Sequence, residues 1–259
     1  MMGFVKKLKK RWLARYHHDL FAWHCEKFFP FDRFLLASEH EYLTHCFQLA
    51  DDYTEVADTG YRHYSYYSYS HRVKNTEVNS SRMAYGSVAN PGEAWELVPN
   101  VLEARKVELP EGIWHKAPYT FYGLGWDILA NHFKVYFRIQ DWDKMDRPIL
   151  RGLFQDANIP CRPEGLVSFT FEDSLLIEEK AYLFPKLQEQ AVFPGAGRRV
   201  LMLSSERGMI AQYDVSDTQA WLPRLNPQGQ RIIEQYKDFD EELDTIAIKN
   251  ANDFTIYFP

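Results

Sequence analysis

Basic and phenolic side chains recur in a repeated pattern in the second half of the sequence. The series consists of Lys134 with Tyr136, Lys180 with Tyr182, Gln212 with Tyr213, and Tyr257. Lysine and arginine donate charge-assisted hydrogen bonds to anionic oxygens such as those of phosphate, and tyrosine hydroxyls add neutral ones. A site that gathered these side chains would therefore bind a phosphate-like anion.

The segments that carry this series alternate between apolar and polar residues, as a β-strand does when its two faces differ. In residues 132–139, one face carries Phe133, Val135, Phe137 and Ile139, and the other carries His132, Lys134, Tyr136 and Arg138. Each such segment has a second strand-like segment nearby, which predicts five β-hairpins. The expected strand pairs are 61–69 with 76–85, 119–127 with 132–138, 166–172 with 179–184, 200–204 with 209–215, and 243–249 with 254–259.

Helices are predicted before and between the hairpins. Residues 4–26 carry apolar side chains at helical spacing, and residues 37–50 include Ser38 as the expected N-cap with Glu41 three positions later. Further helices are expected over 92–106, 141–156 and 226–240, with a short link around 186–197. These helices must cover an apolar face of the sheet.

The order of these elements predicts an α+β fold in a single domain spanning residues 1–259. If the helices all lie on one side, the sheet closes with its polar face inward, as a ten-stranded antiparallel β-barrel surrounded by helices. A barrel of more than about eight strands is too wide for its interior side chains to fill, so a ligand chamber remains. The lysines, arginines and tyrosines would line that chamber.

Composition limits the partners. The chain has 259 residues and a net charge of -6, from 30 basic and 36 acidic side chains, so a nucleic-acid partner is not expected. The three cysteines are far apart and show no metal-binding spacing, which favours a reducing compartment. No apolar run approaches 18 residues, and no signal core follows the basic start. The expectation is a cytoplasmic protein with no membrane partner.

Two other motifs point to different chemistry and fit this architecture less well. The run Asp51-Asp52-Tyr53-Thr54-Glu55 is of the type that binds magnesium diphosphate in all-helical terpene enzymes, but most of this chain is strand-like. Gly123-Leu-Gly125 lacks the third glycine of a dinucleotide-binding loop. The histidines and cysteines show no metal-ligand spacing, so no protein-built metal site is predicted.

Four groups of residues together carry a family resemblance. They are Arg15–Phe21 with Phe29–Phe34, Ser80–Arg82, Gly125–Asp127 with Phe133–Asp141, and Ser168–Glu172 with Glu178–Pro185. In their order and spacing they resemble the ABBA-type aromatic prenyltransferases, and most of all the cyanobactin peptide prenyltransferases, over nearly the full length. The resemblance implies a reaction chamber within ten antiparallel strands. It also implies transfer of a prenyl group from its diphosphate to a linear or macrocyclic peptide, through an allylic carbocation.

The resemblance further implies roles for individual residues. Diphosphate would be bound by Arg82, Lys134, Tyr136, Lys180, Tyr182, Tyr257 and either Gln212 or Tyr213. Mg²⁺ is expected as the counter-ion of the diphosphate. Met202 and Trp126 would form the prenyl pocket, where the bulk of Met202 favours dimethylallyl diphosphate over geranyl diphosphate. Aromatic rings would stabilise the cation and exclude water.

The general base is where the sequence departs from the family pattern. Relatives commonly place a glutamate on or near the first hairpin, whereas residues 61–69 contain no acid. His63, a residue type with an ordinary pKa of about 6.5, and Glu77 are the candidates for the catalytic role. An amine, guanidine or carboxylate acceptor would account for the gap. The alternative function is a non-catalytic barrel that carries an apolar ligand, although a carrier has no need of cations in its chamber.

Overall fold

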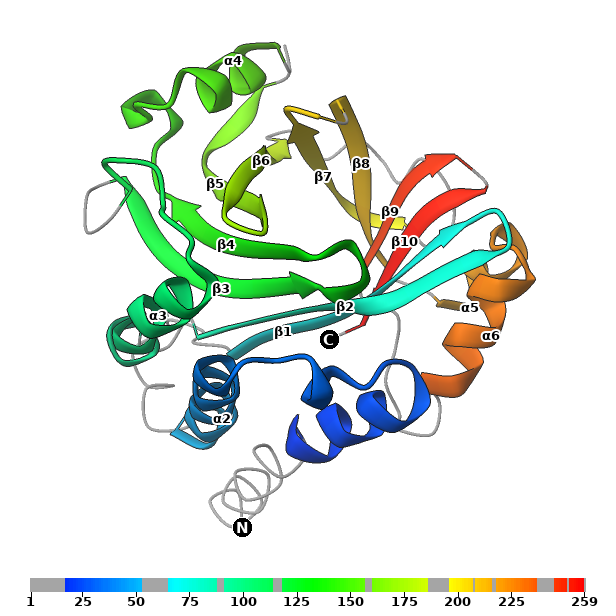
Figure 1. Ribbon diagram of the computed structural model, residues 1–259. Coiled ribbons are helices and arrows are strands. Elements are labelled where there is room, and N and C mark those ends of the chain that lie inside the picture. Colours follow the sequence, from blue (N-terminus) through cyan, green and yellow to red (C-terminus); the bar gives the residue numbers. More distant parts are fainter. Residues whose placement is uncertain are drawn as a thin grey trace, which may run out of the picture.

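Ten antiparallel strands form a closed β-barrel, and the described helices lie outside it (Figure 1). The computed structural model describes residues 17–52, 65–87, 91–113, 118–156, 160–185, 196–206, 208–215, 218–236, 245–250 and 252–258. The strands are β1 (Ser65–Lys74), β2 (Glu77–Ser87), β3 (Tyr119–Asp127), β4 (His132–Ile139), β5 (Cys161–Glu172), β6 (Leu175–Pro185), β7 (Ala196–Ser204), β8 (Gly208–Val215), β9 (Thr245–Asn250) and β10 (Asp253–Phe258). Each strand pairs with its neighbours in the chain, and β1 pairs with β10 to close the ring. The predicted ten-stranded antiparallel barrel is confirmed.

The two ends of the barrel differ because the strands follow one another up and down. The turns of the hairpins β1–β2, β3–β4, β5–β6, β7–β8 and β9–β10 all lie at one end, since consecutive strands run in opposite directions. The longer connections leave from the other end and carry α3 (Pro91–Arg105), α4 (Pro148–Asp156) and α6 (Pro227–Tyr236). One end is therefore built from tight turns and the other from helical connections.

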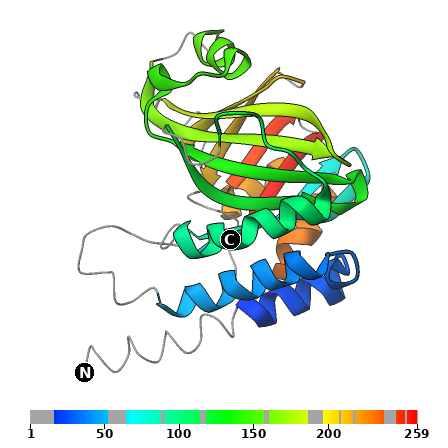
Figure 2. The same ribbon diagram turned by 60° about the vertical axis from the view of Figure 1, so that its left-hand side comes forward.

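Side chains alternate between the barrel interior and an outer apolar core, as the period of two predicts. The outer face of β4 consists of Phe133, Val135, Phe137 and Ile139, all buried in the main core. Lys134 and Tyr136 line the interior instead. The main core packs the barrel wall against α2 (Ala37–Asp52) and α3, and a second core packs β9 and β10 against α6 (Figure 2). The helices thus cover the apolar outer face and leave the polar face inside.

The helices match the predictions in place and differ in detail. Residues 17–27 are helical, within the predicted helix 4–26, and α2, α3 and α6 lie where helices are expected. The prediction of one helix over 141–156 is wrong, because the 3₁₀ turn η4 (Trp142–Lys144) is separated from α4 by an extended Met145. Pro148 begins α4, where its missing N–H leaves no helical hydrogen bond unmade. None of the described helices is long and apolar enough to cross a membrane.

Short helical turns complete the connections between these elements. They are η1 (Phe31–Arg33), η3 (Ile128–Ala130), α5 (Thr218–Trp221) and η5 (Leu222–Arg224). Trp221, at the end of α5, is buried in the second core and lies beside Tyr213 of β8, with ring centroids 6.3 Å apart. This contact places the Tyr213 ring on the outer side of the barrel wall.

The start of α2 is capped by a residue other than the predicted one. The carboxylate of Glu39 accepts a hydrogen bond from the backbone N–H of Leu36 at 2.8 Å, which is one half of a capping box. The hydroxyl of Ser38 is buried, and no hydrogen-bond partner for it occurs in the described part of the chain. The predicted pairing of Ser38 with Glu41 is therefore wrong by two positions, since Leu36 and not Ser38 precedes the helix.

The same Glu39 carboxylate ties three elements together. It is fully buried and accepts two hydrogen bonds from the guanidinium of Arg105, at the end of α3, at 2.7 and 2.9 Å. It also accepts one from the indole N–H of Trp126 on β3, at 2.6 Å. Hydrogen bonds to a charged acceptor are the strong ones, and here they join α2 and α3 to the barrel wall.

Two glycines allow β2 and β3 to approach each other. A Cβ on Gly86 would lie 1.9 Å from the carbonyl oxygen of Tyr122, and a Cβ on Gly123 would lie 2.6 Å from that of Tyr85. The pairing of β3 with β4 is irregular at the same place, between Phe121 and Gly123. Only residues without a side chain permit such close contact of backbones. The β2–β3 junction of the barrel depends on both glycines.

A buried polar chain fastens helical segments to the outer side of β1. The hydroxyl of Tyr236 on α6 lies 2.9 Å from Nε2 of His24 and 2.7 Å from Nε2 of His71. Nδ1 of His71 lies 2.8 Å from the hydroxyl of Ser80. Burial, helped by the positive charge of Arg82, lowers the pKa of His71 to about 3, so this histidine is neutral at physiological pH. Its role is structural, because it lies on the outer face of the barrel wall.

Candidate functional site

The barrel encloses a cavity of about 290 Å³, to which all ten strands contribute. This volume lies near the lower end of the range for small-molecule sites, about 300–1,000 Å³. The predicted site residues among those lining it are Arg82, Trp126, Lys134, Tyr136, Lys180, Tyr182, Met202, Gln212 and Tyr257. Residues far apart in the sequence are thus gathered around one chamber, as the strand alternation predicted.

Some of the predicted site residues are placed differently. Tyr213 packs on the outer side against α5, so Gln212 is the member of that pair that faces the cavity. Trp126 contributes to the wall, but its indole points outward to Glu39. Glu77 is exposed beside the β1–β2 turn, opposite Lys74, and is not among the described residues that line the cavity. His63 lies outside the described residues.

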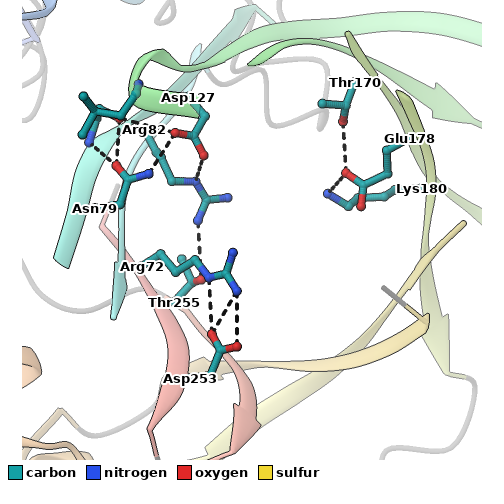
Figure 3. Close-up of polar contacts among 11 residues, drawn as sticks. Arg72, Asn79, Arg82, Asp127, Thr170, Glu178, Lys180, Asp253 and Thr255 are labelled. Atoms are coloured by element: carbon teal, nitrogen blue, oxygen red, sulfur yellow. Dashed lines mark hydrogen bonds and ion pairs between the residues drawn. The ribbon is translucent and has the colours of Figure 1, made fainter. Parts of the chain in front are cut away.

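Arg82 is held in the interior by a network of hydrogen bonds at its carboxylate partner. Its Nε lies 3.2 Å from Asp127, which also accepts hydrogen bonds from the Asn79 amide at 3.0 Å and from the Ser81 hydroxyl at 3.3 Å (Figure 3). Burial alone would raise the pKa of Asp127, but Arg82 and Asn79 outweigh it and leave that pKa below its usual value. Arg82 also donates to Thr255 at 3.5 Å, on β10, which is separated from β2 by β1 alone. Its guanidinium is fixed, with one side turned to the cavity.

Lys180 is held in the same manner on another wall. Its ammonium lies 2.5 Å from Glu178, which is on the same face of β6, two residues earlier. Glu178 also accepts hydrogen bonds from the hydroxyls of Ser204 at 2.5 Å and Thr170 at 3.3 Å. Lys180 and Glu178 are each only 3% exposed, and Figure 3 shows the pair on the opposite side of the interior from Arg82. The carboxylate therefore holds the ammonium in position.

Lys134 differs from these two cations. It is 6% exposed and lines the cavity, yet within the described part of the chain its ammonium makes no hydrogen bond or ion pair. Burial, together with the positive charges of Lys180 and Arg82, lowers the pKa of Lys134 well below its usual 10.5. A buried ammonium without a partner is costly unless an anion joins it. Arg82, Lys134 and Lys180 thus form a cavity wall suited to bind an anionic ligand.

The rest of the cavity wall is phenolic and apolar. The rings of Tyr136 and Tyr182 lie 6.3 Å apart. Gly125, directly across from Lys134, makes room for one of them, since a Cβ there would lie 2.9 Å from the Tyr136 ring. Met202 pairs with Tyr182 on the neighbouring strand. The apolar part of the lining includes Leu166, Phe184, Val200, Met202 and Ile210. The chamber therefore offers cations and hydroxyls to one part of a ligand and an apolar surface to another.

One ion pair in the cavity lining is not predicted from the sequence. Arg72 on β1 donates to both carboxylate oxygens of Asp253 on β10, with donor–acceptor distances of 3.2 and 3.3 Å, and both residues line the cavity. The predicted first strand ends at residue 69, whereas β1 continues to Lys74, so the predicted strand does not include Arg72. Asp253 was missed because it immediately precedes the predicted strand 254–259. The alternation of β1, extended by two residues past Ser70, would have found Arg72.

The described residues do not form a site for the expected Mg²⁺. Magnesium requires several oxygen ligands in octahedral geometry, and usually one or two carboxylates that are free to bind it. The three interior carboxylates, Asp127, Glu178 and Asp253, are each paired with a cation, and no group of three acidic, histidine or cysteine side chains occurs in the described ranges. Magnesium as a counter-ion of diphosphate stays a prediction about the ligand.

Comparisons with known proteins leave the assignment to the geometry. The sequence matches no protein-family model and no curated protein. A proposed function therefore depends on the closed barrel, on the cavity inside it, and on Lys134, whose ammonium makes no hydrogen bond or ion pair with a described residue.

Proposed function

We propose that this protein is a prenyltransferase that moves a dimethylallyl group from its diphosphate to a peptide. The observation that carries the proposal is the position of Lys134, a buried ammonium that faces an enclosed cavity without a partner, between Arg82 and Lys180. A diphosphate would supply the missing negative charge. An apolar prenyl chain would occupy the wall that includes Met202 and Ile210.

The same groups suit the departure of diphosphate. As the bond between C1 of the prenyl group and the diphosphate oxygen breaks, its electron pair leaves with the diphosphate and negative charge builds up on those oxygens. Cations fixed in a water-poor cavity stabilise that charge without having to reorganise. Arg82 and Lys180 are fixed by carboxylates, and Lys134, which makes no ion pair with a described residue, would gain a direct counter-charge from the ligand.

The prenyl cation left behind is stabilised by a different part of the chamber. The rings of Tyr136, Tyr182 and Tyr257 line it, and an aromatic face attracts a cation by about 0.5–2 kcal/mol per ring. The same rings would shield the cation from water, which would otherwise capture it and give an alcohol. The acceptor atom then bonds to C1 and loses its proton.

The substrate assignments have separate support. The side chain of Met202, which is 7% exposed within the cavity lining, limits the depth available to the prenyl group, in favour of five carbons over ten. A peptide acceptor is supported by the order of sequence motifs, which is similar to that of the cyanobactin peptide prenyltransferases. A barrel that merely carries an apolar ligand would gain nothing from burying Lys134 among other cations.

The first test separates these two functions by ligand charge. The purified protein is heated alone, with dimethylallyl diphosphate, and with dimethylallyl alcohol. Ligand at one hundred times its Kd stabilises the folded state by about 2.7 kcal/mol, so the Tm should rise clearly with the diphosphate and not with the alcohol. Equal shifts, or a shift with the alcohol alone, would contradict the proposal and support the carrier. Mass spectrometry of a peptide panel incubated with dimethylallyl and geranyl diphosphates then identifies the acceptor.

A further inference from the structure

Among the side chains that the structure describes, three interior carboxylates, Asp127, Glu178 and Asp253, differ in what surrounds them. Asp127 is engaged by Arg82, Asn79 and Ser81, and Glu178 by Lys180, Thr170 and Ser204. Neither appears in the cavity lining. Asp253 does, and it is the one acidic residue to do so among the described residues. An acceptor bound in the cavity can reach this carboxylate and not the other two.

The ion pair that holds Asp253 is more open than the other two. The side chain of Arg72 is 34% exposed, against 13% for Arg82 and 4% for Lys180. Ion pairs in contact with water are screened and contribute little to stability, so this one can open at small cost. Arg72 therefore orients the Asp253 carboxylate and leaves it able to accept a proton.

The position of Asp253 also places it within reach of the reacting atoms. Thr255, which accepts a hydrogen bond from Arg82, is two residues further along β10 and lies on the same face. Two residues of a strand span about 7 Å, so Asp253 lies about that distance along the strand from the point where Arg82 meets β10. Figure 3 shows Asp253 below Arg72 and Thr255, with Arg82 above them, on one side of the interior. The Asp253 carboxylate therefore lies beside the wall formed by Arg82, Lys134 and Lys180, and is not part of it.

We propose that Asp253 is the general base of the transfer, an inference that rests on the proposed prenyltransferase function. The bond from C1 of the prenyl group to the diphosphate oxygen breaks first, and the acceptor atom then forms its bond to C1 of the allylic cation. The diphosphate keeps the electron pair of its broken bond to C1. The proton of the acceptor passes to a carboxylate oxygen of Asp253, and the electrons of the broken acceptor–hydrogen bond stay with the acceptor. Arg72 is a positioning residue in this step.

This assignment accounts for the missing acid on the first hairpin. Residues 61–69 contain none, and Glu77, at the turn of that hairpin, is exposed outside the cavity lining. Asp253 enters the same region from the other side, because β10 pairs with β1 and sets Asp253 opposite Lys74. Closure of the barrel thus supplies from the last strand the carboxylate that the first hairpin lacks.

The test uses the full-length protein with dimethylallyl diphosphate and the peptide found to be the best acceptor. Asp253→Asn removes the base, and Arg72→Gln/Asp253→Asn removes both charges, so that one variant folds even if an unpaired Arg72 destabilises the other. A general base contributes about 10²–10⁴ in rate, so prenylated peptide should form at least about 100-fold more slowly in both variants. Glu164→Gln is the matched control, because Glu164 is also a strand carboxylate paired with an arginine, Arg162, but its side chain is 37% exposed, against 16% for Asp253, and it is not among the described residues that line the cavity.

A further readout separates a lost base from a lost site. The Tm shift with dimethylallyl diphosphate should persist in Asp253→Asn, because the diphosphate-binding cations Arg82, Lys134 and Lys180 are unchanged in this variant. Prenylation within threefold of wild type in both variants would overturn the assignment, as would a 100-fold loss in Glu77→Gln with none in Asp253→Asn. If the wild-type protein neither binds nor consumes the diphosphate, the proposed function itself fails and this inference fails with it.

Discussion

At the scale of single residues, Lys134 is the feature that most clearly separates a binding chamber from ordinary packing. The interior cations Arg72, Arg82 and Lys180 are each paired with a carboxylate, so those pairs are consistent with a purely structural role. Lys134 is buried beside two other positive charges and is not paired with any described residue. A side chain so arranged lowers stability, which makes a ligand the simplest reason for its presence.

Replacing this lysine should therefore separate stability from binding. Lys134→Met keeps a similar shape and removes the buried charge, so the free energy of unfolding at pH 7 should rise by about 1 kcal/mol or more. The Tm shift with dimethylallyl diphosphate should shrink, because affinity falls about 10- to 100-fold when a hydrogen bond to a charged group is lost. Lys144→Met, at a side chain that is 72% exposed, is the control. A less stable Lys134→Met variant with full diphosphate binding would count against the site.

The stabilisation by Lys134→Met should also depend on pH. Because the pKa of Lys134 in the folded protein lies well below the usual 10.5, the unfolded chain holds a proton between these two values that the folded protein does not. The wild-type protein therefore gains stability as pH rises through that window, by up to about 1.4 kcal/mol per pH unit. Urea titrations of both proteins at several pH values up to 10 should show their difference shrinking. A constant difference would mean that Lys134 is not buried as described.

Residue types and their period predicted most of the cavity lining, and they failed where the backbone departs from regular strands. Lys134 and Tyr136 follow from simple alternation on β4. The outward indole of Trp126 does not, because it lies beyond the irregular pairing between Phe121 and Gly123. The role of Asp253 could not be predicted from the sequence, for another reason. Its importance comes from the pairing of β10 with β1, and no local pattern records a contact between strands at opposite ends of the chain.

At the scale of elements, the strands were easier to predict than the helix boundaries. A strand in this barrel has one apolar and one polar face along most of its length, so the pattern repeats every two residues. Helix ends depend on single capping groups. Glu39 replaced the predicted Ser38 and Glu41 as the residue that holds the start of α2, since it also receives hydrogen bonds from Arg105 and Trp126. Those partners belong to α3 and β3, so the sequence around the start of α2 does not reveal them.

The Glu39 carboxylate should therefore be a strong determinant of stability. Glu39→Gln removes the charge that faces Arg105 and weakens the hydrogen bonds at the α2–α3–β3 junction. Loss of one partner of a buried ion pair costs about 3 kcal/mol, measured as the free energy of urea unfolding. Glu41→Gln, an exposed position on the same helix, should change it by less than about 0.5 kcal/mol. Equal effects at the two positions would show that the junction is not held by this carboxylate.

At the scale of the whole molecule, closure of the barrel depends on the close approach of β2 and β3. Gly86→Ala would force a methyl group to within 1.9 Å of the Tyr122 carbonyl oxygen, so the two strands must separate. We expect a loss of about 3 kcal/mol or more in the free energy of unfolding, at the upper end for overpacking. Gly152→Ala is the control, since a Cβ there meets nothing within 4 Å and alanine favours the helix α4 by about 1 kcal/mol. Similar stabilities of the two variants would contradict this account of the junction.

The seam between β1 and β10 has a consequence for how the chain reaches its native state. During synthesis the first hairpin emerges early, but its partner strand lies some 180 residues downstream, after every other strand. Until translation reaches residue 258, one edge of the nascent sheet has no neighbour, and bare edges invite pairing with other chains. Contacts so distant in sequence also form slowly. Closure of the barrel in the cell should therefore be a late event that follows synthesis of β10 and is helped by chaperones shielding that edge.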